Sequence, residues 1–180
     1  QLNVWGRHLL DNALAAWSVG RAVGIDDATI AVRLARACTP PRRAEVIDAG
    51  DVTFIDDTAS QSQTSVKAAL SLLGSLKAKR RVVICGSQFG DAATHAKFGH
   101  QIVEVGSADT MVVVGDSVRE ITRGAIDAGM PRAQCLHCDA VAFPEKISNF
   151  LAAGDVILFT GVDAELAQRV LALFHNAAPV

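Results

Sequence analysis

Three segments of this chain are apolar along almost their whole length, and they restrict its fold more than any other feature. They lie within residues 81–85, 110–114 and 155–160, and a glycine follows each of them directly. A strand with one face in water alternates between apolar and polar residues, whereas a strand buried on both faces is apolar throughout. The three segments therefore predict a parallel sheet that is covered by helices on both faces.

Stretches with a helical spacing of apolar residues separate these segments. Ahead of them, two short strands at residues 44–49 and 52–55 flank Asp48-Ala49-Gly50-Asp51, a turn sequence that indicates a β-hairpin. Alternating strands and helices predict an α/β fold, with a Rossmann-like, doubly wound and mainly parallel sheet. The predicted helices span residues 65–76, 92–105 and 163–175, a further one runs from Asp116 or Ser117 to residue 128, and a weak strand is expected at 133–137. A helix is also expected at 139–151, either kinked at Pro144 or beginning there.

The N-terminal part of the chain has a different rhythm. A helix is expected at residues 6–23 and a second one from Asp26 or Asp27 to about residue 37, with no strand between them. Pro40 and Pro41 then interrupt the helical pattern and indicate a linker. We therefore divide the chain into residues 1–38, which close a preceding domain, and a C-terminal domain at residues 39–180. The start within a helical pattern suggests the C-terminal part of a longer protein.

Composition excludes several classes of function. The net charge of −2 argues against a nucleic-acid-binding surface, and no apolar run is long enough to insert into a membrane. The four cysteines form no disulfide framework at this length. Cys135 and Cys138 have a C-x-x-C spacing that is also found in redox and zinc sites, but no second Cys/His pair accompanies them. We interpret them as strand residues with reduced thiols, which agrees with a cytoplasmic protein.

Charged residues near the predicted strand ends and the linker are candidates for a binding site. Asp56 and Asp57 close the second hairpin strand. One of them could face the crevice and bind ribose hydroxyls or a metal-bound phosphate, or it could cap the following turn. Arg42 and Arg43 follow the rigid prolines and could direct a guanidinium at phosphate, or they could be solvated surface residues. No phosphate-binding P-loop and no G-x-G-x-x-G occurs in the chain.

Five segments, taken in order, resemble the last part of the Mur ligases, which use ATP to build the peptidoglycan peptide. Gly6-Arg7-His8 with Asn12-Ala13-Leu14-Ala15-Ala16 is similar to the G-x-H-N-x-x-N-A-L-A-A helix that ends the family's central ATPase domain. The others are Pro41-Arg42-Arg43-Ala44-Glu45 (G-R-M-E), Ile55-Asp56-Asp57 (I-D-D-S-Y-N-A-N-P), His95-Ala96-Lys97-Phe98-Gly99 (H-x-x-V-G) and Gly154-Asp155-Val156-Ile157-Leu158 with Gly161 (G-D-V-V-L-V-K-G-S). The likeness is greatest to the MurF type, which adds D-alanyl-D-alanine to a UDP-MurNAc-tripeptide.

This resemblance implies roles for three residues. Asn12 would contact the adenine of ATP, whereas Arg43 and Asp57 would meet the nucleotide when the last domain closes. The implied reaction forms an acyl phosphate from a carboxylate and ATP, and an incoming amine then displaces phosphate. The implied cofactors are ATP and Mg2+, bound mainly by the upstream domain. The implied partners are a UDP-MurNAc-peptide and an amino acid or dipeptide. We expect this part alone to be inactive, and we expect replacement of Asp57 to affect catalysis rather than folding.

Three motifs depart from the family pattern, and in the first of them Leu9 stands after His8 where the helix motif has asparagine. The tyrosine, asparagines and proline that follow I-D-D are replaced by residues such as Ala59, Ser60 and Ser62, and K-G-S-R is replaced by Thr160-Gly161-Val162-Asp163. These changes leave an alternative open, namely a non-catalytic domain of the same fold that serves in binding or assembly.

Overall fold

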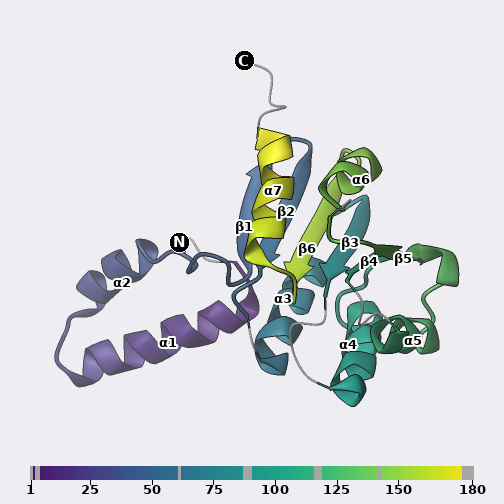
Figure 1. The fold of residues 1–180 in the computed structure, drawn as a ribbon. Helices are drawn as coiled ribbons and strands as arrows, with labels where there is room; N and C mark the ends of the chain where they lie inside the picture. Colours follow the sequence, from purple (N-terminus) through teal and green to yellow (C-terminus); the bar gives the residue numbers. More distant parts are fainter. Residues whose placement is uncertain are drawn as a thin grey trace.

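A six-stranded sheet forms the centre of the molecule. A computed structural model describes residues 2, 5–60, 62–86, 91–115, 119–141 and 143–175 (Figure 1). The strand order is β1-β2-β6-β3-β4-β5, with β1 antiparallel to β2 and every other neighbouring pair parallel. The strands are β1 (Glu45–Ala49), β2 (Val52–Asp57), β3 (Arg80–Cys85), β4 (Thr110–Val114), β5 (Cys135–Cys138) and β6 (Asp155–Thr160). The predicted α/β class and doubly wound, mainly parallel sheet are confirmed.

Helices cover both faces of this sheet, as the apolar strands require. One buried cluster joins α3, α4 and α5 to alternate strand residues such as Ile55, Val83 and Leu158. The opposite cluster joins α6 and α7 to the intervening residues, among them Phe54, Ile84 and Phe159. The helices are α3 (Gln63–Ser75), α4 (Ala92–Glu104), α5 (Arg119–Asp127), α6 (Phe143–Phe150) and α7 (Ala164–His175), with a short 3-10 turn at Arg132–Gln134.

The last strand in the sequence lies in the middle of the sheet. β6 pairs with β2 on one side and with β3 on the other, and all six of its residues are buried. Its register brings Thr160 opposite both Asp57 of β2 and Cys85 of β3. The carboxyl ends of these three parallel strands therefore meet at one edge, which is where ligands bind in sheets of this kind.

Helices α1 (Arg7–Ala22) and α2 (Asp27–Ala35) form a hairpin that projects sideways from the sheet (Figure 1). Asp26 caps α2, because its carboxylate accepts the backbone N–H of Thr29 at 2.9 Å. Apolar side chains on the two helices stay exposed, among them Leu10, Leu14, Val19 and Val32. An amphipathic helix normally buries such residues, so the hairpin carries an apolar surface that the described part of the chain does not cover.

Most predicted element boundaries agree with the structure within a few residues. α6 begins at Phe143, with Pro144 in its first turn, which agrees with the alternative of a helix that begins at this proline rather than at residue 139. Proline is favoured there because it lacks the N–H that a first turn leaves unpaired. The expected cap at Asp116 or Ser117 and the residues after Gly86, 87–90, lie outside the described residues.

The four cysteines are free thiols. Cys135 and Cys138 lie on β5 and pack on opposite sides of the sheet, against different core clusters. Their prediction as strand residues is therefore confirmed, with the two side chains on opposite faces of the sheet.

Candidate functional site

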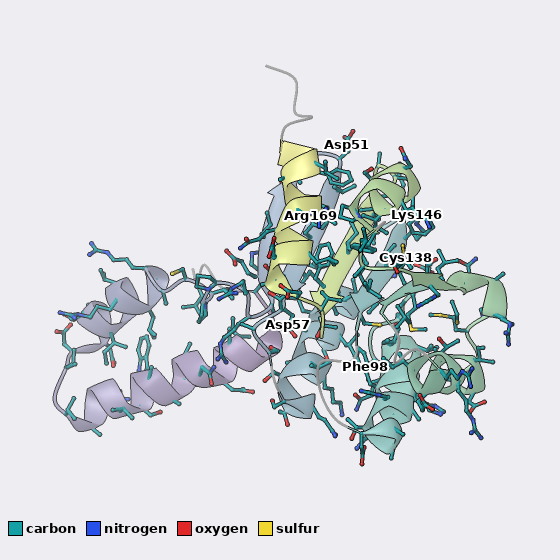
Figure 2. The ribbon with its side chains drawn as sticks, viewed as in Figure 1. Asp51, Asp57, Phe98, Cys138, Lys146 and Arg169 are labelled. Carbon is teal, nitrogen blue, oxygen red and sulfur yellow. The ribbon has the colours of Figure 1, made fainter. Side chains whose placement is uncertain are left out.

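One pocket lies where the α1–α2 hairpin meets the sheet, and it contains all three residues predicted to bind the nucleotide. Its volume is about 310 Å³. Asn12 comes from α1, Arg43 from the linker between α2 and β1, and Asp57 from the end of β2. The remaining lining residues are Leu9, Pro40, Ala44, Ser60, Ser65 and Ala68. Figure 2 places Asp57 at this junction, at the opposite end of β2 from the turn that holds Asp51.

Asp57 lies on the floor of this pocket with its carboxylate already bonded to the protein. The residue is 1% exposed, and its Oδ1 accepts the backbone N–H of Ala44 at 2.9 Å and the hydroxyl of Ser60 at 2.6 Å. The Thr160 hydroxyl donates to Oδ2 at 3.4 Å. The carboxylate thus joins the linker, the loop after β2 and the end of β6.

Burial also changes the acidity of this group. It raises the pKa of Asp57 from 3.8 to about 6, and the hydrogen bonds from Ser60, Ala44 and Thr160 limit the rise because they favour the charged form. Removal of the carboxylate would leave Ala44 N–H without its acceptor. We therefore correct one expectation, since replacement of Asp57 is expected to affect folding as well as catalysis.

The neighbouring Asp56 has a separate role. Its Oδ1 accepts both the backbone N–H and the hydroxyl of Thr58, at 3.0 and 2.7 Å, so it holds the turn after β2. The two adjacent carboxylates therefore have different partners. Adjacent side chains on a strand point to opposite faces, so the two carboxylates do not form an acid/base pair.

The linker that carries Arg43 has an unusual backbone. The N–H of Arg43 bonds to the carbonyl of Pro40 at 3.3 Å, which closes a four-residue turn with Pro41 at its second position. Arg42, at the third position, has φ of 59°. A proline followed by a residue of positive φ is the pattern of a type II turn, in which glycine usually occupies the third position. Ala44 has φ of 53°, so both neighbours of Arg43 adopt a conformation that is uncommon without glycine.

Arg43 and Asn12 are the groups of this pocket that remain available to a ligand. Both residues are exposed, whereas Asp57 is buried beneath them. A guanidinium binds phosphate oxygens in bidentate geometry, and a carboxamide offers both a donor and an acceptor to a purine edge. The residues present therefore fit parts of a nucleotide.

Sequence reasoning missed three contributors to this site, namely Ala44, Ser60 and Thr160. Thr160 reaches Asp57 because β6 lies beside β2, and strand order in a parallel sheet is not encoded in local sequence. Ser60 is 5% exposed, although its sequence context is a polar loop. The signal that could have indicated these residues is Asp57 itself. A carboxylate at the end of a buried strand needs hydrogen-bond donors from its neighbours.

Other candidate sites are not supported. Within the described residues, no group of three or more His, Cys, Asp or Glu side chains could hold a metal ion. His137 Nε2 lies 2.8 Å from the carbonyl of Gly115, which is a structural contact. No helix in the described part of the chain is both long and apolar enough to cross a bilayer.

Known proteins share this fold and much of this sequence. A UDP-N-acetylmuramate–L-alanine ligase of Synechococcus sp. (strain JA-3-3Ab) is 47% identical over 193 residues, which cover 99% of this chain and 36% of the relative. A ligase with the same description from Synechococcus sp. (strain JA-2-3B'a(2-13)) is 32% identical over 191 residues, covering 99% of this chain and 38% of that protein. The chain thus spans less than two fifths of the length of these relatives.

Solved structures agree on the fold. MurC of Thermotoga maritima, a UDP-N-acetylmuramate–alanine ligase, has a TM-score of 0.76 at 19% identity and covers 98% of this chain and 40% of its own. MurF of Acinetobacter baumannii has a TM-score of 0.75 at 23% identity, with coverage of 93% and 38%. The family model for the Mur ligase, glutamate ligase domain matches residues 42–162. This match extends over more than half of the chain, which therefore belongs to the Mur ligase family.

Proposed function

We propose that the full-length protein is an ATP-dependent ligase that joins an amino acid or dipeptide to a UDP-MurNAc-linked carboxylate. The observation that carries this proposal is the shared pocket of Asn12, Arg43 and Asp57, which come from three separate segments of the chain. A solved relative, MurF of Thermotoga maritima with a TM-score of 0.70, is described as a complex with ADP.

The chemistry divides between this chain and the rest of the protein. The substrate carboxylate attacks the γ-phosphorus of ATP, which forms an acyl phosphate and releases ADP. The amine then attacks the acyl carbon of this acyl phosphate and releases phosphate. Arg43 would neutralise phosphate charge, and Asn12 would bind the adenine. Mg2+ and most of the ATP contacts would belong to an upstream domain, in the cytoplasm, where we place the protein.

We also propose a boundary between two domains. Residues 1–38 would close the central ATPase domain, and residues 39–180 would form the last domain of the ligase. The exposed apolar residues of α1 and α2 support this division, because a preceding domain would cover them. Arg43 then stands directly after the boundary, where domain movement would carry it toward or away from the nucleotide.

Two amines are candidates. D-alanyl-D-alanine, which a MurF-type ligase adds to a UDP-MurNAc-tripeptide, is favoured by the order of sequence motifs. L-alanine is favoured by the relatives that are 32–47% identical, which are described as L-alanine ligases. Each amine implies its own acceptor, so the two possibilities can be separated with purified substrates.

The test measures phosphate release by the full-length protein with each matched pair of substrates. UDP-MurNAc with L-alanine and UDP-MurNAc-tripeptide with D-alanyl-D-alanine are each assayed with ATP and Mg2+, and the control for each pair omits the amine. Amine-dependent phosphate release with one pair supports the proposal and identifies the amine. Absence of release with both pairs would favour the alternative, a non-catalytic domain that serves in binding or assembly.

A further inference from the structure

Glu45 directly follows the linker and has no place in the proposed chemistry. It begins β1 and is half-buried, and its Oε2 accepts the backbone N–H of Arg42 at 2.8 Å. Among the described residues, no ion pair joins Glu45 to a guanidinium. Its carboxylate therefore acts on the backbone of the turn rather than on the charge of a neighbouring side chain.

The backbone that Glu45 contacts is the strained part of the turn. Arg42 has φ of 59° at a position where a type II turn normally has glycine. A non-glycine residue adopts this region at a cost, and it persists there only when the surroundings hold it. Two contacts do so, since Glu45 accepts the N–H of Arg42, and the carbonyl of Arg42 accepts the N–H of Ala59 at 2.9 Å.

The turn also fixes Arg43 from its other side. Ala44 has φ of 53°, and its N–H is bound by the buried carboxylate of Asp57. Arg43 therefore stands between two left-handed residues, each with its N–H held by a carboxylate. Its own N–H bonds to Pro40. Both carboxylates therefore bind the backbone on either side of Arg43, whose side chain lines the pocket.

We propose that Glu45 is a positioning residue, which holds Arg42 in the left-handed conformation and thereby directs the Arg43 guanidinium at the bound nucleotide. This inference rests on the proposed ligase function for its effect on turnover. Its effect on the backbone does not depend on that function.

The first experiment removes the Glu45 carboxylate and then replaces Arg42 with glycine, which adopts a positive φ without that carboxylate. In the full-length protein, Glu45→Ala is expected to lower kcat/KM for ATP by about tenfold, the size expected for one misdirected charge-assisted contact. Glu45→Gln keeps an oxygen that accepts the N–H, and it should stay within about threefold of wild type on the same reasoning. Arg42→Gly should restore Glu45→Ala to a similar level, because glycine adopts positive φ without strain.

A second pair of variants tests whether Glu45 acts through Arg43. Glu45→Ala added to Arg43→Ala should cause no further loss of kcat/KM, because the group that Glu45 directs is already absent. A further loss of about tenfold in that background would overturn the proposal. The proposal is also overturned if Glu45→Gln is as impaired as Glu45→Ala, or if Arg42→Gly gives no rescue.

Amide hydrogen exchange in the full-length protein separates this idea from the ligase function. Peptides that include Arg43, Ala44 and Ala59 report the bonds to Pro40, Asp57 and Arg42. Exchange in these peptides should be about fivefold faster in Glu45→Ala, and wild-type-like in Glu45→Ala with Arg42→Gly. If wild type releases no phosphate with any precursor, the ligase proposal fails while this readout still decides whether Glu45 holds the turn. Unchanged exchange in Glu45→Ala would show that it does not.

Discussion

The buried Oδ1 of Asp57 accepts the backbone N–H of Ala44 at 2.9 Å, and Ala44 holds a φ of 53° that alanine rarely adopts. The end of β2 and the linker after α2 are thus fixed to one another by a single carboxylate. Asp57, which is expected to contact the nucleotide, therefore also holds the backbone that forms part of the pocket.

Asp57→Ala should therefore destabilise the protein as well as impair turnover. It leaves Ala44 N–H without an acceptor and removes the partner of the Ser60 hydroxyl, for which we expect a loss of about 1–3 kcal/mol in the free energy of unfolding. Urea unfolding of wild type and Asp57→Ala measures the loss. Asp57→Asn is the control, because it keeps an oxygen toward Ala44. A free energy of unfolding in Asp57→Ala equal to that of wild type would contradict this role.

The raised pKa of Asp57 predicts a dependence of stability on pH. A carboxyl whose pKa rises from 3.8 to about 6 on folding binds its proton more tightly in the folded state, so its contribution to stability is present at low pH. This contribution is lost as the pH rises from about 4 to about 6, and the full shift corresponds to about 3 kcal/mol.

Urea unfolding of wild type and Asp57→Asn at several pH values between 4 and 7 provides the measurement. The free energy of unfolding of wild type relative to that of Asp57→Asn should fall over this pH interval, because the aspartate titrates and the asparagine does not. At higher pH this difference should stay constant. Parallel curves for the two proteins would show that the pKa of Asp57 is not raised.

Arg43→Ala tests the pocket from its exposed side. Arg43 is exposed and lines the pocket, so its loss should lower ligase activity by at least about tenfold with an unchanged melting temperature. Cys135→Ser, made on β5 away from the pocket, should retain wild-type turnover. Phosphate release and melting curves for the full-length variants are the measurements. Wild-type turnover in Arg43→Ala would remove this residue from the site.

Gly124→Ala should destabilise the fold without touching the pocket. A Cβ at Gly124 of α5 would overlap the backbone carbonyl of Ala96 in α4, and neither helix can yield locally. Overpacking of this kind costs about 1–3 kcal/mol. Gly20→Ala is a matched control, because its Cβ would meet the flexible end of Ile30 instead. Urea unfolding of both variants should show a clear loss for Gly124→Ala alone.

The sequence predicted those parts of the structure that depend on local pattern. The apolar segments at residues 110–114 and 155–160 identified two central strands, and Asp26 marked the start of α2, because burial and capping leave a signature within a few residues. Asn12, Arg43 and Asp57 were proposed through motif resemblance, and they line one pocket. Their roles toward a nucleotide stay predictions.

The rest depended on contacts between distant residues. The bond between Thr160 and Asp57 joins positions that are 103 residues apart and exists only because β6 pairs with β2. The positive φ of Ala44 is accompanied by a bond from its N–H to the buried carboxylate of Asp57, 13 residues further along the chain, and alanine does not favour that conformation. Sequence pattern carries no information on such compensation.

The position of β6 has a consequence for how the protein is made. β2 and β3 have no contact as sheet neighbours until β6 enters between them, and β6 is the last of the six strands that the ribosome delivers. A nascent chain that ends before residue 155 would hold a hairpin and a separate three-stranded sheet, each with an open edge that can pair with other chains. Synthesis of β6 closes this gap and brings Thr160 to Asp57 in the same step. Asp57 therefore gains the Thr160 hydroxyl only after all the segments that line the pocket have been synthesised, and a product that ends before β6 would keep both strand edges open to aggregation.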